Sequence, residues 1–143
     1  MKWLLDTDVL SQPAKKLGDK RVVAWIEQEQ SNCYTSAIVI AQLAYWVRSK
    51  NGNARRLLEQ WLSHLVNALE GRIYSFNVSI AHTWADQRYL LEQAGKPMPL
   101  EESLIAATAR KHNLIIATGN EKDFCQPGLK IFNPFKISER EFV

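Results

Sequence analysis

Cysteine and histidine are too few and too scattered in this chain to predict a zinc-type metal centre. The two cysteines, Cys33 and Cys125, belong to no C-x-x-C or cysteine/histidine spacing, and we interpret them as buried or incidental thiols. The three histidines, His64, His82 and His112, lack H-x-x-x-H and H-E-x-x-H spacing. We interpret them as structural residues.

Long apolar runs are also absent. No stretch approaches the roughly 18 to 20 residues that a membrane span needs, and "MKWLLDTDVL" meets two acids before the apolar region of a signal peptide could form. We therefore expect a cytoplasmic protein without a membrane segment. Repeats, low-complexity tracts and linkers are lacking too, so we expect a single domain over residues 1–143.

Charge of one sign is only slightly in excess. The formal net charge of +3 suits a polyanionic partner but is too small to predict one. The densest basic group has two interpretations, contact with a phosphate backbone or a solvated helix–loop surface, and we favour the second. Its members are Arg48, Lys50, Arg55 and Arg56.

The chain does contain a regular alternation of predicted strands and helices. Short apolar runs predict strands at 1–6, 72–76, 114–118 and 129–132. Apolar residues at helical spacing predict helices at 21–30, from an N-cap at Thr35 or Ser36 through Val47, and at 53–71, 78–95 and 99–113. This order predicts an α/β fold with three α/β/α layers and a mostly parallel central sheet.

Carboxylates follow two of the predicted strands. Asp6 comes directly after the first strand, and Asp123 follows the strand at 114–118. Glu102 lies in the first turn of the helix before that strand, where the helix dipole favours an acid. Functional groups of parallel sheets gather beyond the carboxyl ends of the strands, near the point where the strand order reverses. We therefore expect these three acids to meet.

Acids that meet in this way predict a divalent cation. Clustered carboxylates repel one another and stay ionised at neutral pH only when a cation or hydrogen-bond donors compensate them. Mg²⁺ and Mn²⁺ take oxygen ligands, retain waters, bridge to phosphate and stabilise the oxygens of a phosphodiester cleavage. A site of Asp6, Glu102 and Asp123 thus predicts Mg²⁺ or Mn²⁺ and chemistry on phosphodiesters.

Each acid also has a simpler local interpretation, which the sequence leaves open. Asp6 suits the N-cap of a helix that starts near Val9. Glu102 suits the helix dipole alone, and Asp123 suits a turn. For Asp8 we favour the role of local N-cap over that of a ligand.

A second enzyme class shares the first acidic motif. "LLDTDVL" resembles the D-x-D-x-[TV] motif of haloacid-dehalogenase-type phosphatases, which would make Asp6 a nucleophile and Asp8 an acid/base. The chain is short for that fold, and the lysine of its late helix–strand context is not evident. We therefore disfavour this interpretation.

Four segments, in order and at matching spacing, resemble PIN domains of the VapC toxin type. They are "LLDTDVLS" at 4–11, "TSAIVIAQL" at 35–43, "LEESLIAATARKHNLIIATGNEKDF" at 100–124 and "LKIFNPF" at 129–135. The resemblance implies a PIN-like fold and an Mg²⁺- or Mn²⁺-dependent ribonuclease acting on RNA. It also implies a cognate antitoxin and a homodimer.

The site residues of the family are carried over by position. The four family acids fall on Asp6 and Asp123, which match, on Glu102, which is one methylene longer than the usual Asp, and on Gln42, which is an amide. Thr118 and Asn120 match the polar residues that line the same pocket.

The amide at Gln42 affects both metal binding and catalysis at such a site. Its carbonyl oxygen can orient a metal-bound water, but the amide removes one negative charge and adds a donor. Because Mg²⁺ often uses only one or two protein carboxylates, we expect a residual or altered ribonuclease in which Asp6, Glu102 and Asp123 hold the ion. The alternative is a catalytically inactive PIN-fold module that binds RNA or an antitoxin.

Five tryptophans are interpreted mainly as core or dimer packing. They are Trp3, Trp25, Trp46, Trp61 and Trp84. Tyr45 and Trp46 lie beside Gln42 in the sequence, and they are the aromatic residues that we expect to meet RNA or a partner chain.

Overall fold

A central parallel sheet organises the computed structural model, which describes residues 1–138; residues 139–143 of the predicted domain lie outside that range. The strand order is β3-β2-β1-β4-β5, and every pairing is parallel. The strands are β1 (Trp3–Leu5), β2 (Cys33–Ser36), β3 (Ile73–Tyr74), β4 (Ile115–Ala117) and β5 (Ile131–Phe132). The predicted parallel sheet is confirmed, although β2 was expected only as the approach to a helix, and β3 and β5 are shorter than predicted.

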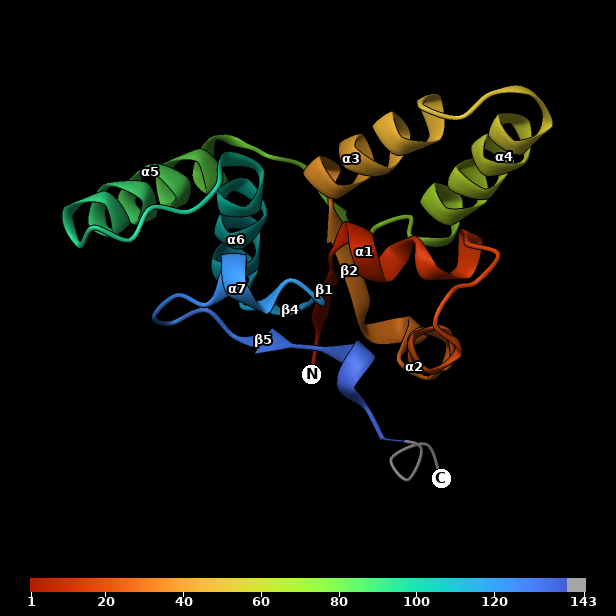
Figure 1. Cartoon of the computed structure of the whole chain (residues 1–143). Helices are drawn as coiled ribbons and strands as arrows, with labels where there is room; N and C mark the ends of the chain where they lie inside the picture. The colour runs from red at the N-terminus through yellow and green to blue at the C-terminus, as the bar shows by residue number, and fades with distance from the viewer. Residues whose placement is uncertain (139–143) are drawn as a thin grey trace.

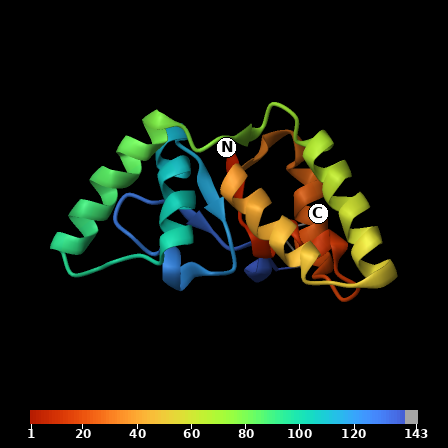
Figure 2. The same cartoon turned by 90° about the horizontal axis from the view of Figure 1, so that it is seen from above.

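Helices cover both faces of this sheet (Figure 1). Seen from above, one side carries α2, α3 and α4, and the other carries α5 and α6 (Figure 2). The helices are α1 (Thr7–Leu10), α2 (Lys20–Gln28), α3 (Ala37–Arg48), α4 (Gly52–Ala68), α5 (Val78–Gln93), α6 (Leu100–His112) and α7 (Glu121–Phe124). The predicted three-layer α/β/α fold is confirmed. Within residues 1–138, no helix has the length and apolar character needed to cross a membrane.

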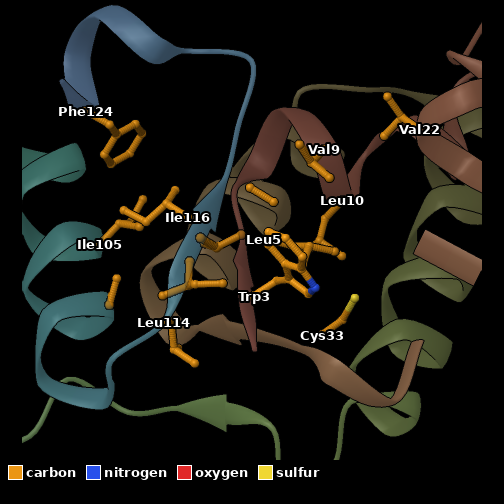
Figure 3. Close-up of a cluster of buried hydrophobic side chains, with 14 of the residues drawn as sticks. Trp3, Leu5, Val9, Leu10, Val22, Cys33, Ile105, Leu114, Ile116 and Phe124 are labelled. Atoms are coloured by element: carbon orange, nitrogen blue, oxygen red, sulfur yellow. The ribbon is translucent and has the colours of Figure 1, made fainter. Parts of the chain in front are cut away.

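The hydrophobic core lies where β1 and β4 run side by side. Leu5 and Ile116 are fully buried between the layers, with Ile105 of α6 packed against Ile116 (Figure 3). Burial of each such side chain contributes about 1.5–3 kcal/mol. The short apolar runs form strands because both of their faces are covered in this way.

Capping residues fix where the helices start and stop. Ser36 is the N-cap of α3, as predicted, and its hydroxyl accepts a hydrogen bond of 3.0 Å from the Ile38 amide. Asn113 ends α6 in the left-handed region, with φ of 53°. Asparagine tolerates this conformation, which turns the chain from α6 into β4 within two residues.

The strand order reverses between β1 and β4. The chain runs from β1 outward through β2 to β3, and later returns to place β4 on the other side of β1. Asp6 follows β1 directly and Thr118 follows β4 directly. These two side chains therefore stand at the position where parallel sheets place their ligand sites.

Candidate active site

Asp6 is both a helix cap and the central acid of the site. It is the N-cap of α1, and its Oδ1 accepts a hydrogen bond of 2.8 Å from the Thr7 amide. Its Oδ2 accepts one of 2.8 Å from the Thr118 hydroxyl, across the reversal point of the sheet. The side chain is only 8% exposed. The local and the functional interpretation of Asp6 are thus compatible, because the cap holds the carboxylate in place.

Asp8 does not have the role that the sequence suggested. The N-cap of α1 is Asp6, so the prediction that Asp8 caps a helix locally is wrong. Asp8 lies inside the first turn of α1, and its Oδ2 accepts a hydrogen bond of 2.9 Å from the Gly119 amide. Its Oδ1 is buried and has no hydrogen-bond partner. This carboxylate therefore connects α1 to the loop that follows β4.

An open pocket of about 770 Å³ lies in front of Asp6. This volume falls in the range of small-ligand sites and is large enough for a nucleotide. The predicted site residues Gln42, Glu102 and Asn120 line it together with Asp6, because α3 packs against both α1 and α6. The predicted site did not include six further lining residues, Thr7, Asp8, Ser11, Lys15, Ala41 and Glu101.

The Gln42 side chain is already engaged within the pocket. The Thr7 hydroxyl donates a hydrogen bond to its Oε1. One acceptor position at most then remains on that oxygen for a water, whereas the amide Nε2 is purely a donor. The structure therefore makes Gln42 better suited to donate to an anionic oxygen than to face a cation.

The loop after β4 forms a chain of hydrogen bonds that leads away from Asp6. The Thr118 hydroxyl, fully buried, accepts a hydrogen bond of 2.9 Å from the Asn120 amide while donating to Asp6. The Asn120 Nδ2 in turn donates to Asp123 Oδ2 at 3.0 Å. Of these predicted residues, Asn120 lines the pocket, whereas Thr118 and Asp123 do not and are connected to it through these hydrogen bonds.

Comparison with known proteins identifies the family of this chain. The family model described as PIN domain matches residues 3–128. The chain belongs to the PIN-domain family. It is 34% identical to the toxin FitB of Neisseria gonorrhoeae over 92% of this chain and 97% of FitB. It is 32% identical to the VapC ribonuclease Y4jK of Sinorhizobium fredii over 93% of this chain and 97% of that protein.

Solved structures agree with this family assignment. The crystal structure of FitAcB from Neisseria gonorrhoeae superposes with a TM-score of 0.88 at 33% identity, covering 94% of this chain and 99% of the other. The structure of FitAB bound to a DNA fragment gives 0.87 at 30% identity, covering 95% and 97%. The PIN assignment agrees with the predicted family and leaves the dehalogenase-type interpretation of "LLDTDVL" without support.

Burial raises the pKa values of three acids that line the pocket of this PIN domain, and repulsion between carboxylates adds to the effect for two of them. Burial, with a smaller contribution from the neighbouring Asp8 charge, raises the pKa of Asp6 to about 6, although the Thr118 and Thr7 hydrogen bonds act in the opposite direction. Burial also raises the pKa of Asp8. Burial raises the pKa of Glu102, and the charges of Asp123, Asp6 and Glu101 add to this. The acids are thus close enough to sense one another.

The residues of the pocket fit a hard divalent cation held by few protein ligands. Four described lining residues carry carboxylates, Asp6, Asp8, Glu101 and Glu102, whereas one, Lys15, carries a positive charge. The donors are oxygens, as Mg²⁺ and Mn²⁺ prefer. Across residues 1–138, no three His, Cys, Asp or Glu side chains are arranged to hold a metal ion together. The donor set therefore suits a site of one or two carboxylates completed by water.

The aromatic residues singled out in the sequence are divided between the pocket and the core. Tyr45 and Trp46 line it, and Tyr45 is 78% exposed. Trp3 and Trp25 are buried in the core, as predicted, whereas Trp46, Trp61 and Trp84 are half-buried.

The basic cluster between α3 and α4 is a surface feature with local partners. Arg55 pairs with Glu59 at 2.7 Å, and the Lys50 ammonium lies over the Trp46 ring. These contacts agree with the solvated-surface interpretation that we favoured.

Proposed function

We propose that this PIN domain is an Mg²⁺- or Mn²⁺-dependent ribonuclease of the VapC toxin type that hydrolyses RNA phosphodiesters. The observation that carries the proposal is the convergence of Asp6, Glu102 and Asn120 on one open pocket at the reversal point of the sheet, rich in acids and poor in bases. The names of the relatives, a toxin and a ribonuclease, support the same activity.

The side chains have separable tasks in this proposal. A bound Mg²⁺ or Mn²⁺ supplies Lewis acidity and a water of lowered pKa at the scissile phosphate. Asp6 holds the ion, with Glu102 and Asp123 contributing charge from α6 and α7. Thr118 and Asn120 fix the orientation of the carboxylates through the hydrogen bonds described above.

Gln42 and the exposed aromatic side chain serve the RNA itself. The Gln42 amide donates to a phosphate oxygen, which replaces the predicted role of orienting water through its carbonyl. Tyr45, exposed at the pocket rim, offers a ring on which an unpaired base can stack.

The test is cleavage of a fluorescently labelled single-stranded RNA by the purified chain. We expect cleavage with Mn²⁺, loss of cleavage with EDTA, and a decrease of at least about 100-fold for Asp6→Asn, because the cation loses its central ligand. The matched control is Asp86→Asn, an exposed aspartate of α5 outside the pocket, which should cleave like the native chain. Cleavage that survives EDTA or Asp6→Asn contradicts the proposal.

The second candidate function is an inactive PIN module that binds RNA or an antitoxin, and the neutral Gln42 is the observation in its favour. The variant Gln42→Glu separates the two. If the native chain does not cleave RNA with Mn²⁺ while Gln42→Glu does, the inactive module is correct. If the native chain cleaves and Asp6→Asn does not, the ribonuclease is correct.

We also propose that the chain works with a cognate antitoxin and as a homodimer. The antitoxin is supported by the similar structures FitAcB and FitAB, which are complexes, and by the name of the toxin FitB. The homodimer is supported by exposed apolar side chains on α5 and at the start of α6, which water solvates poorly. These are Val78, Tyr89, Leu90 and Leu100.

A further inference from the structure

The Asp8 carboxylate is only partly compensated by the groups around it. One oxygen accepts the Gly119 amide, whereas the other is buried without a hydrogen-bond partner. Two neighbouring polar side chains bind the Asp8 backbone and not its carboxylate, since the Ser11 hydroxyl and the Gln12 amide both donate to the Asp8 carbonyl. An ionised oxygen buried in this way costs free energy unless a cation or a donor reaches it.

No basic side chain pairs with Asp8 in the structure. Lys15 lines the same pocket and its charge favours the ionised form of Asp8, but among residues 1–138 it forms no ion pair with Asp8. The adjacent carboxylate is Asp6, on the same turn and lining the same pocket. Two neighbouring carboxylates with no ion pair to a basic side chain favour the binding of further positive charge.

Position 42 does not contribute to the negative charge of the pocket. Gln42 is neutral, and its carbonyl oxygen is tied to Thr7, the residue between the two aspartates. The side chain from α3 is therefore anchored on the turn that carries both acids. In this chain the second carboxylate beside Asp6 comes from α1 itself.

We propose that Asp6 and Asp8 together hold the divalent cation, and that Asp8 supplies the carboxylate that Gln42 lacks. This inference rests on the proposed metal dependence and adds a ligand that the sequence had assigned to helix capping. Two carboxylates completed by water are the ligand number that Mg²⁺ commonly uses.

The test measures the dissociation constant of Mn²⁺ by isothermal titration calorimetry on the full chain. Asp8→Asn keeps the shape and an oxygen for the Gly119 amide but removes the charge. We expect it to weaken Mn²⁺ binding by about tenfold or more, the size of effect seen when a supporting group of a metal site is lost. The matched control, Asp86→Asn, removes an aspartate charge outside the pocket and should bind like the native chain.

A second substitution distinguishes charge supply from general damage. If Asp8 replaces the missing acid of position 42, Gln42→Glu should restore most of the affinity that Asp8→Asn loses. Binding by Asp8→Asn within about twofold of native, while Asp6→Asn binds no Mn²⁺, would overturn the role of Asp8 and leave the proposed function intact. A native chain that binds no Mn²⁺ would instead overturn the proposed function.

The native chain provides a measurement that needs no variant to fold. With carbon-13 aspartate, the side-chain carboxyl resonance of Asp8 should shift together with that of Asp6 as Mg²⁺ is added, while that of Asp86 stays in place. A shift of Asp6 without Asp8 overturns the inference.

Discussion

Asp6 occupies a position that favours function over stability. Its carboxylate is almost completely buried, and its pKa is raised to about 6 from an ordinary value of 3.8. Between these two values the folded chain binds more protons than the unfolded chain, so the free energy of unfolding falls as the pH rises. The ionised form at neutral pH is therefore a cost to the metal-free fold.

Asp6→Asn should accordingly stabilise the chain in EDTA at pH 7.5. Asparagine keeps the N-cap but removes the buried charge. The expected gain is about 1–2 kcal/mol in the free energy of unfolding, less than the roughly 3 kcal/mol that the pKa shift corresponds to, because one hydrogen bond to the carboxylate is lost. Urea unfolding measures it. The gain should disappear near pH 4, where Asp6 is protonated in the native fold, and a gain that persists there would refute this explanation.

Individual site residues differ in how far the sequence predicted them. Asp6 could be predicted because it directly follows a predicted strand, where parallel sheets bind ligands. Glu102 could be predicted because it lies in the first turn of a predicted helix, where the helix dipole favours an acid. Asp8 could not, because its sequence position suits a helix cap equally well. Only the structure shows that Asp8 lines the pocket and accepts a hydrogen bond from the Gly119 amide, 111 residues away in the sequence.

At the scale of elements, the loop between β4 and α7 is fitted closely to α1. A Cβ atom on Gly119 would stand 2.8 Å from Asp8 Oδ2 and 2.9 Å from a ring carbon of Phe135. The absence of a side chain at Gly119 therefore lets the loop approach Asp8 closely enough for its amide to donate.

Gly119→Ala should destabilise the chain by about 1–3 kcal/mol, the usual cost of overpacking. It should also slow RNA cleavage, because the displaced loop carries Asn120. Thermal unfolding and the RNA assay measure the two effects. Phe135→Leu in the Gly119→Ala background should recover part of the stability by making room for the methyl group. No recovery would show that the contact with Asp8 dominates.

The elements themselves were predicted well where periodicity is long and poorly where it is short. Helices α4, α5 and α6 agree with their predicted ranges to within a few residues. Strand β2 was missed, because its four residues "CYTS" carry too few apolar side chains to show a pattern. Burial from neighbouring strands, rather than its own composition, makes it a strand.

At the scale of the whole molecule, α5 exposes three large apolar side chains, Val78, Tyr89 and Leu90. We expect a dimer in light scattering coupled to gel filtration, since a lasting interface buries well over about 1,000 Å². Leu90→Lys on α5 should yield a monomer. Leu57→Lys on α4 is the matched control, since Leu57 and Leu90 are 53% and 58% exposed, and it should remain dimeric. Dissociation by Leu57→Lys alone would place the interface on α4 instead.

The pairing of β1 with β4 also determines when the pocket can exist. Asp6 and the Thr118 hydroxyl that orients it are separated by 112 positions in the sequence. During synthesis, the first acid leaves the ribosome long before its partner has been translated. A nascent chain that stops before Thr118 therefore lacks the hydrogen bond that orients Asp6 and, under the proposed function, should not cleave RNA.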